Sequence, residues 1–184
     1  MDILFKTIRD ANTFEQNEIH KIYNQSFPKI EKMSFDYILS MTTNKDVKFL
    51  MAVNEEIIGL VFLIEKENEA LIYYFAINDV VRSKGYGSIV LTKLKEKYQN
   101  LIIIMEKVNK ESIDYELQEK RLKFYQKNDF KLTDYLLSDY SGEFELLSEE
   151  DYIDLICQGI SMIPEEMVVH RLTGDAPRAT LIGP

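Results

Sequence analysis

A glycine-containing segment between two apolar runs most strongly limits how this chain can fold. Residues 71–77 (LIYYFAI) are apolar on both faces, and residues 101–105 (LIIIM) are a second apolar run, so both are expected to be buried strands. Residues 86–98 between them place apolar side chains at helical spacing. A strand, a loop, a helix and a buried strand form a β-α-β unit, which predicts an α/β protein.

Further apolar and β-branched runs predict additional strands, at residues 3–8, 47–53, 57–64, 130–137 and 144–147. Helices are expected where apolar residues recur every three or four positions, over residues 13–27, 34–41 and 112–126 and again after Ser148. Thr13 is expected to cap the N-terminal helix, with Gln16 completing a capping box, and Pro28 to end it.

The loop before the helix at residues 86–98 has the composition of an anion site. Its residues are Arg82, Ser83, Lys84, Gly85, Tyr86, Gly87 and Ser88. The glycines let backbone amides approach a ligand, and the helix start adds unpaired N–H groups and the positive end of its dipole, which together suit a diphosphate. The spacing matches neither the dinucleotide fingerprint nor the Walker loop. On spacing alone, a phosphate site and a structural turn are equally good interpretations.

The spacing Arg82-x-x-Gly85-x-Gly87, preceded by Phe75-Ala76-Ile77, resembles the acetyl-coenzyme A signature of the GCN5-related N-acetyltransferase (GNAT) family. The resemblance implies that the loop amides hold the coenzyme A pyrophosphate. It also implies that the main chain of Phe75, Ala76 and Ile77 binds the pantetheine arm and supplies an oxyanion donor. The implied fold is a mixed, mostly antiparallel sheet of six to seven strands with helices on both faces.

A second match lies downstream, where Phe124 to Phe130 (FYQKNDF) is similar to the family's Tyr-x-x-x-Gly-Phe segment. The resemblance places Tyr125 beside the thioester sulfur, and Asn109 matches a frequent family asparagine near the pantetheine. Asp129 stands where the family usually has glycine. Because Asp tolerates a left-handed backbone better than most residues, we expect the turn to be kept.

The resemblance implies an N-acetyltransferase that moves an acetyl group from acetyl-CoA to a primary amine. A phenol can donate a proton to a leaving thiolate, so Tyr125 is the expected donor, although most tyrosines are packing residues. Glu106 follows a buried strand and is the candidate base. The alternative is that Glu106 is only a solvated residue at the end of a strand and that a water relay accepts the proton. A non-catalytic acetyl-CoA-binding module and a different nucleotide binder are the rival functions.

The net charge of −9 is expected to repel nucleic acid and to attract a small cationic acceptor, although acidic surfaces also simply keep proteins soluble. The only cysteine, Cys157, excludes an internal disulfide and fits a cytoplasmic protein. No apolar run is long enough to cross a membrane. His20 and His170 lack ligand partners at metal-site spacing, so no metal is expected.

One domain is expected over residues 1–170. Residues 171–184 change in composition and are interpreted as a disordered tail or an added, non-native segment. An exposed closing strand makes a homodimer conceivable. The acceptor pocket is expected to involve residues 23–41 and the loop after Leu137, where Phe27, Phe35, Tyr37 and Tyr140 are either pocket wall or core.

Overall fold

The computed structural model describes residues 2–139 and 142–148. The chain forms two compact units, Met1–Leu101 and Ile102–Pro184. Several features expected from the sequence lie outside the described residues, namely Tyr140, the helix after Ser148, Cys157, His170 and the segment 171–184.

The first unit is built on four antiparallel strands in the order in which they occur in the chain. These are β1 (Leu4–Thr7), β2 (Val47–Asn54), β3 (Glu56–Lys66) and β4 (Glu69–Ile77). The β2–β3 hairpin turns at Glu55, as the sequence predicted. Its middle residues are buried on both faces, which explains why these strands show apolar runs and not a simple alternation.

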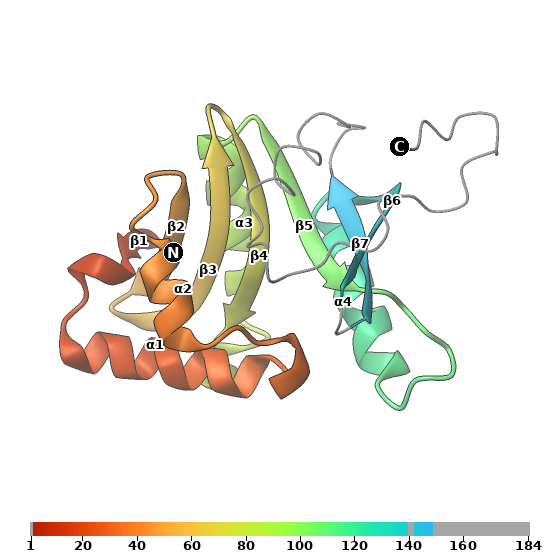
Figure 1. Cartoon of the computed structure of the whole chain (residues 1–184), viewed down its shortest axis with the longest axis horizontal. Coiled ribbons are helices and arrows are strands. Elements are labelled where there is room, and N and C mark those ends of the chain that lie inside the picture. Colours follow the sequence, from red (N-terminus) through yellow and green to blue (C-terminus); the bar gives the residue numbers. More distant parts are fainter. Residues whose placement is uncertain (1, 140–141, 149–184) are drawn as a thin grey trace. The chain divides into compact units, whose positions relative to one another are not determined.

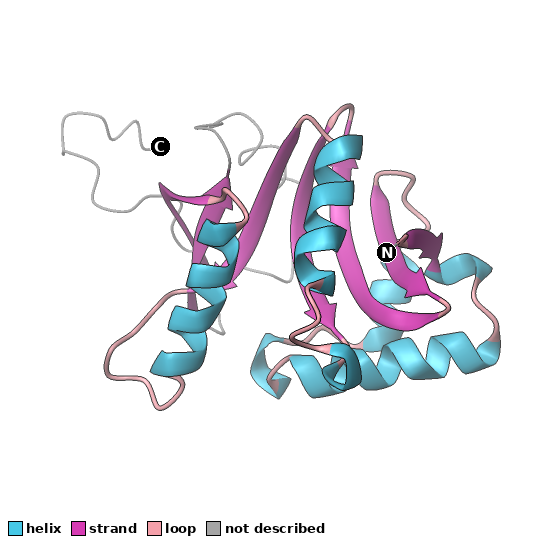
Figure 2. Ribbon diagram, turned by 180° about the vertical axis from the view of Figure 1, so that it is seen from behind, coloured by secondary structure: helices cyan, strands magenta, loops and turns pink. Residues whose placement is uncertain are grey.

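Helices cover both faces of this sheet. Helices α1 (Thr13–Ser26) and α2 (Phe35–Met41) lie on one face, and α3 (Tyr86–Lys97) lies on the other (Figures 1 and 2). Each of the two longer helices buries one apolar stripe, Ile19, Ile22 and Tyr23 on α1 and Val90, Leu91 and Leu94 on α3. The burial of these stripes drives the helices onto the sheet.

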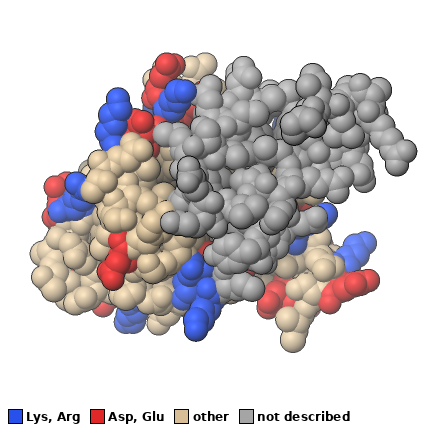
Figure 3. All heavy atoms as spheres, in the orientation of Figure 1, with Lys and Arg blue, Asp and Glu red and all other residues tan. Residues whose placement is uncertain are grey.

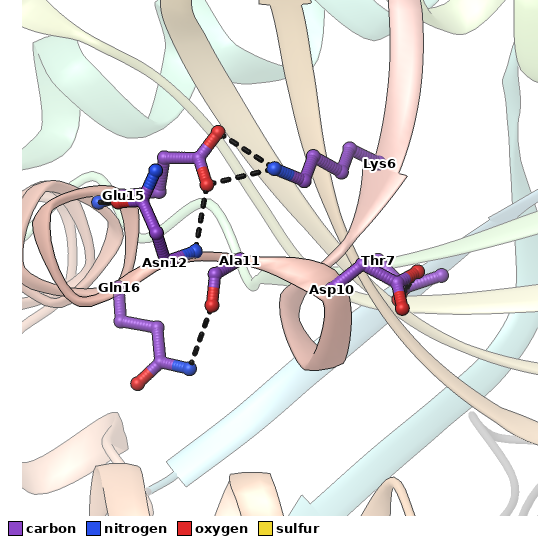
Figure 4. A network of polar contacts seen from close by, with 7 residues as sticks. All are labelled: Lys6, Thr7, Asp10, Ala11, Asn12, Glu15 and Gln16. Carbon is purple, nitrogen blue, oxygen red and sulfur yellow. Dashed lines mark hydrogen bonds and ion pairs between the residues drawn. The ribbon is translucent and has the colours of Figure 1, made fainter.

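Helix α1 starts one residue earlier than expected, so the predicted cap was wrong. Asn12 is the N-cap: its side chain accepts from the Glu15 N–H at 3.0 Å, and the Glu15 carboxylate accepts from the Asn12 N–H at 2.8 Å. Lys6 from β1 also binds Glu15, at 2.7 Å (Figure 4). Asn caps as well as Thr. The Glu15 carboxylate binds both the Asn12 N–H and Lys6. Gln16, which was expected to complete the capping box, donates to the Ala11 carbonyl at 3.3 Å.

Two buried tyrosines hold the segment between α1 and α2 on the sheet. The Tyr74 hydroxyl donates to the Glu31 carbonyl at 2.7 Å and accepts from the Met33 N–H at 3.2 Å. The Tyr23 hydroxyl donates to the Met33 carbonyl at 3.1 Å. Phe27 packs on Tyr74 with ring centroids 4.8 Å apart. This aromatic cluster fixes the segment that was expected to shape an acceptor pocket.

The second unit has three antiparallel strands and one helix. The strands are β5 (Asn100–Glu106), which begins at the end of the first unit, β6 (Lys131–Asp139) and β7 (Gly142–Ser148). They pair in the order β5-β7-β6, with Ile103 opposite Leu147. Helix α4 (Tyr115–Lys127) covers one face of these strands (Figures 1 and 2).

Seven strands and four α-helices are therefore present within residues 2–139 and 142–148, and the predicted mixed α/β fold is confirmed. None of the described helices is both long and apolar enough to span a lipid bilayer. In the part of the surface that Figure 3 shows for described residues, acidic and basic side chains are interspersed.

A polar cluster ties the end of α3 to β2 and β3. The Glu65 carboxylate accepts from the buried Tyr98 hydroxyl and from Lys97 at 2.9 Å, and it pairs with Lys48 at 3.2 Å. Burial raises the pKa of Glu65, but the hydrogen bonds from its three partners outweigh burial and leave the pKa below its ordinary value of 4.5.

Glu65→Gln should lower the free energy of unfolding by about 2 kcal/mol at pH 7, because the variant loses the charge on which this cluster is built. A carboxylate with a lowered pKa stabilises the fold above its unfolded-state pKa and loses that effect as the pH falls through the folded-state pKa. The difference between variant and parent should therefore shrink below about pH 4.5 in urea unfolding experiments. Glu67→Gln, at an exposed turn position, is the control, and a pH-independent loss in Glu65→Gln would contradict this explanation.

Candidate active site

The end of β4 needs a glycine on the neighbouring strand. Gly59 lies opposite Ile77, and a Cβ at Gly59 would approach the Ala76 carbonyl oxygen to 2.3 Å. Only glycine fits this close approach. Among the predicted pantetheine-binding residues, Ala76 is buried, while Phe75 and Ile77 are half-buried on the same strand.

Arg82 holds the start of the glycine loop against the end of β4. Its Nε donates to the Ile77 carbonyl at 3.1 Å, and its guanidinium pairs with Asp79 at 2.6 Å. Asn78 caps the short turn between them by accepting from the Val80 N–H at 3.2 Å. Arg82, one of the residues predicted for the phosphate loop, shapes that loop in the structure through these two contacts.

The glycine loop contains two residues with left-handed backbone, Ser83 at φ 64° and Gly85 at φ 84°. Gly85 is the N-cap of α3, and a Cβ built on it would meet no atom within 4 Å. The conformation therefore calls for glycine, while the space beside it is open. Turns that alternate between right- and left-handed residues direct successive N–H groups into one concavity that suits an anion.

The backbone N–H groups of residues 83–88 make no hydrogen bond to any residue that the structure describes. The N–H of Ile89 is the first that is satisfied, by the Gly85 carbonyl at 3.3 Å. Ser83, Lys84 and Gly85 are exposed, so these donors face solvent. A row of unpaired donors at the positive end of a helix dipole is an arrangement that suits an anion.

Two further residues predicted for this loop lie in the first turn of α3. Tyr86 is half-buried, and its hydroxyl accepts from the Asn54 side chain at 3.4 Å, which ties the helix start to the β2–β3 turn. Ser88 is half-buried, and its carbonyl accepts from the Thr92 hydroxyl at 2.9 Å.

The second unit brings together Tyr125, Glu106 and Arg121. Glu106 ends β5, and the Arg121 guanidinium donates to its Oε1. Tyr125 follows Arg121 by one helical turn, is only 8% exposed, and has no hydrogen-bond partner for its hydroxyl among the described residues. Burial raises the pKa of Tyr125, the Glu106 carboxylate raises it further, and the Arg121 guanidinium opposes both.

The turn after Tyr125 fixes the position of this side chain. The Phe130 N–H donates to the Tyr125 carbonyl and the Asp129 N–H to the Gln126 carbonyl, both at 3.1 Å, which is a Schellman motif. Asp129 has φ 68°, so the expected left-handed turn is confirmed. The buried Phe130 ring packs on Tyr125 with centroids 6.3 Å apart.

Asn109 lies in the loop between β5 and α4. Its N–H donates to the Gln118 side chain at 2.9 Å, and its own side chain accepts from the Glu111 N–H at 2.9 Å. Its amide oxygen therefore shapes this loop in the ligand-free protein. The described residues contain no cluster of three or more potential metal ligands.

The glycine loop and the Phe124–Phe130 segment are both covered by one family match. The sequence profile of the acetyltransferase (GNAT) family matches residues 16–130, more than half of the chain. The chain belongs to the GNAT family. The family predicted from the two motifs is thereby confirmed.

Solved structures share the GNAT fold at low sequence identity. A protein named as a GNAT-family acetyltransferase from Bacteroides thetaiotaomicron superposes with a TM-score of 0.71 and 18% identity, over 88% of this chain and 96% of that one. An aminoglycoside 6'-N-acetyltransferase complexed with coenzyme A superposes with a TM-score of 0.62 and 12% identity, over 82% and 99% of the two chains. These likenesses support the fold.

The C-terminal part of the chain has a different likeness. Residues 136–184 match the profile of the Radical_SAM C-terminal domain. In a separate comparison that gives no residue range, 43 residues of the chain are 51% identical to the uncharacterized protein YtqA of Bacillus subtilis strain 168, which is 23% of this chain and 13% of YtqA. The profile match includes residues 171–184, the segment that differs in composition.

Sequence reasoning did not single out Gly59 and Arg121. Gly59 gave no signal of its own, because a glycine inside a strand is also compatible with a bulge. Arg121 precedes Tyr125 by four residues, and this helical spacing was a usable signal that the two share a face of α4.

Asp129→Gly should raise the free energy of unfolding by about 1 kcal/mol, because glycine relieves the cost of a left-handed residue at the end of α4. Chemical denaturation measures this. Lys127→Gly, inside the last turn of the same helix, should instead destabilise the protein by about 1 kcal/mol. Destabilisation by Asp129→Gly would show that the aspartate contributes more than a tolerated backbone conformation.

Proposed function

We propose that this chain is an N-acetyltransferase that transfers the acetyl group of acetyl-CoA to a primary amine of a small cationic acceptor. The observation that carries the proposal is the row of backbone N–H groups at residues 83–88, which lack partners among the described residues. Membership of the GNAT family makes acyl-CoA the ligand class for this loop.

The first unit fits the phosphate end of the acyl donor. The open space beside Gly85 gives a diphosphate access to the amides, and the exposed Lys84 adds a positive charge. The half-buried backbone at Phe75 and Ile77 is proposed to bind the pantetheine arm and to donate to the developing oxyanion. Ser88 is proposed to add a hydroxyl for the phosphates. Asn109, in the second unit, is proposed to contact the pantetheine.

The reaction joins the acceptor nitrogen to the thioester carbonyl carbon and breaks the carbon–sulfur bond. The nitrogen must lose a proton and the leaving sulfur must gain one or be stabilised by a hydrogen bond. We assign the first role to Glu106, directly or through water, since its Oε2 has no partner in the Arg121 ion pair. We assign the second to Tyr125, because a phenol is protonated at neutral pH and can donate, and burial raises its pKa further.

The proposed class of acceptor is based on the net charge of the chain. A net charge of −9 favours a cationic molecule over an acidic one. The segment fixed by Tyr23 and Tyr74 supplies an aromatic surface, including Phe27 and Phe35, that suits an ammonium group. A cytoplasmic location and a homodimer remain proposals from the sequence.

Gly85→Ala should weaken coenzyme A binding about tenfold. A methyl group at φ 84° costs about 1–2 kcal/mol, and the loop relieves that strain only by turning its amides away from the bound phosphates. Isothermal titration calorimetry measures the affinity. Pantetheine, which lacks the phosphates, is the control ligand and should bind parent and variant alike. Equal coenzyme A affinity in the variant would mean that the loop is only a turn.

Tyr125→Phe should lower kcat by about 10²-fold while leaving the dissociation constant for coenzyme A nearly unchanged, since only the hydroxyl is lost from a buried ring. Steady-state thiol release gives kcat, and calorimetry gives the affinity. Unchanged turnover would remove Tyr125 from the mechanism.

The deciding experiment measures thiol release from acetyl-CoA across polyamines, amino acids, aminoglycosides and peptide amines. Turnover with a cationic small amine supports the proposal, and turnover with peptides alone would contradict the acceptor class. Thermal stabilisation by acetyl-CoA without turnover of any amine would favour the alternative, a non-catalytic coenzyme-binding module. Stabilisation by ATP or NAD but not by acetyl-CoA would reject both.

A further inference from the structure

Arg121 is a cation that acts on both members of the proposed catalytic pair, Glu106 and Tyr125. Its guanidinium donates to Glu106 Oε1 and lies on the same face of α4 as Tyr125, one turn away. The Arg121 side chain is 35% exposed and the Glu106 side chain 18%. The ion pair is therefore partly shielded from water and links α4 to the end of β5.

The Arg121–Glu106 ion pair affects which group can accept a hydrogen bond from the Tyr125 hydroxyl. A half-buried carboxylate without a partner seeks a hydrogen-bond donor, and a neighbouring phenol is a strong one. Arg121 occupies one oxygen of Glu106, and the phenol has no partner among the described residues. The arginine thus satisfies the carboxylate that would otherwise compete for the phenolic proton.

We propose that Arg121 is a positioning residue of the transfer reaction, which holds Glu106 by one oxygen and leaves the Tyr125 hydroxyl free to donate to the departing sulfur. This inference rests on the proposed acetyltransferase activity. The single contact between nitrogen and Oε1 leaves Oε2 of the same carboxylate available to accept a proton from the acceptor amine.

A second ion pair on α4, between Lys123 and Glu119, is a surface pair that serves for comparison. Lys123 binds Glu119 at 2.8 Å within one turn of α4, and both side chains are more exposed, at 66% and 40%. Neither residue acts on Tyr125. Exposed pairs of this kind contribute little to stability. Lys123→Met is therefore the matched control for Arg121→Met.

The kinetic test compares Arg121→Met, Arg121→Lys and Lys123→Met. Arg121→Met should lower kcat roughly tenfold with an unchanged dissociation constant for coenzyme A, since the loss lies in the chemical step. Arg121→Lys should recover most of kcat, because one nitrogen contact is all that the geometry uses. Lys123→Met should match the parent. A loss of kcat that lysine does not restore, or an equal loss in Lys123→Met, would overturn the inference.

A second experiment measures the pKa of the Tyr125 phenol and does not require catalytic activity. A fluorinated tyrosine is placed at position 125 and titrated by ¹⁹F NMR in the ligand-free protein. Arg121→Met should raise the phenol pKa by about one unit, since removing a nearby positive charge and freeing Glu106 both disfavour the phenolate. Glu106→Gln should lower the phenol pKa, and the double variant should return close to the parent because both charges are gone.

The two readouts separate the inference from the function on which it rests. If no amine is acetylated by the parent protein but the titration shifts as expected, the proposed function fails and the electrostatic role of Arg121 stands. If the parent is active and Arg121→Met leaves both kcat and the titration unchanged, the inference is wrong and the proposed function stands.

Discussion

The proposed function depends on a short stretch of backbone, residues 83–88, whose N–H groups make no hydrogen bond to any described residue. Helices begin with N–H groups that lack partners, and most proteins cap them with a side chain. Helix α1 follows that rule through Asn12 and Glu15 (Figure 4). Helix α3 has Gly85 at its N-cap and no side-chain cap. Within the first unit, whose other two α-helices have side-chain caps, the uncapped start is a local property of the glycine loop, and we propose that its donors bind a ligand.

The second unit holds the Tyr125 ring in place and brings charged groups near it. The Schellman motif after α4 fixes where the helix ends and packs Phe130 on Tyr125. Burial then raises the phenol pKa, and the charges of Glu106 and Arg121 act on it in opposite directions. The backbone motif fixes the position of the ring, while burial and the two charges act on its pKa.

The sequence predicted what depends on local chemistry and missed what depends on neighbours in space. The glycine loop and the left-handed Asp129 follow from backbone sterics, which hold in any fold. The cap at Thr13 was wrong because Asn12 and Thr13 are both good caps, and Lys6 on a separate strand adds to the preference for Glu15. The roles of Gly59 and Arg121 need the pairing of β3 with β4 and of α4 with β5, which a single sequence does not display.

The C-terminal likeness can be weighed against the pairing of strands in the second unit. The GNAT match ends at residue 130 and the other match begins at residue 136, inside β6. Strand β7 nevertheless pairs with β5 from Phe144 to Ser148, with Ile103 opposite Leu147 and Glu106 opposite Phe144. Residues 136–139 and 142–148 therefore complete the sheet that carries Glu106. Whatever relation residues 136–184 have to other proteins, their first part belongs structurally to the acetyltransferase fold.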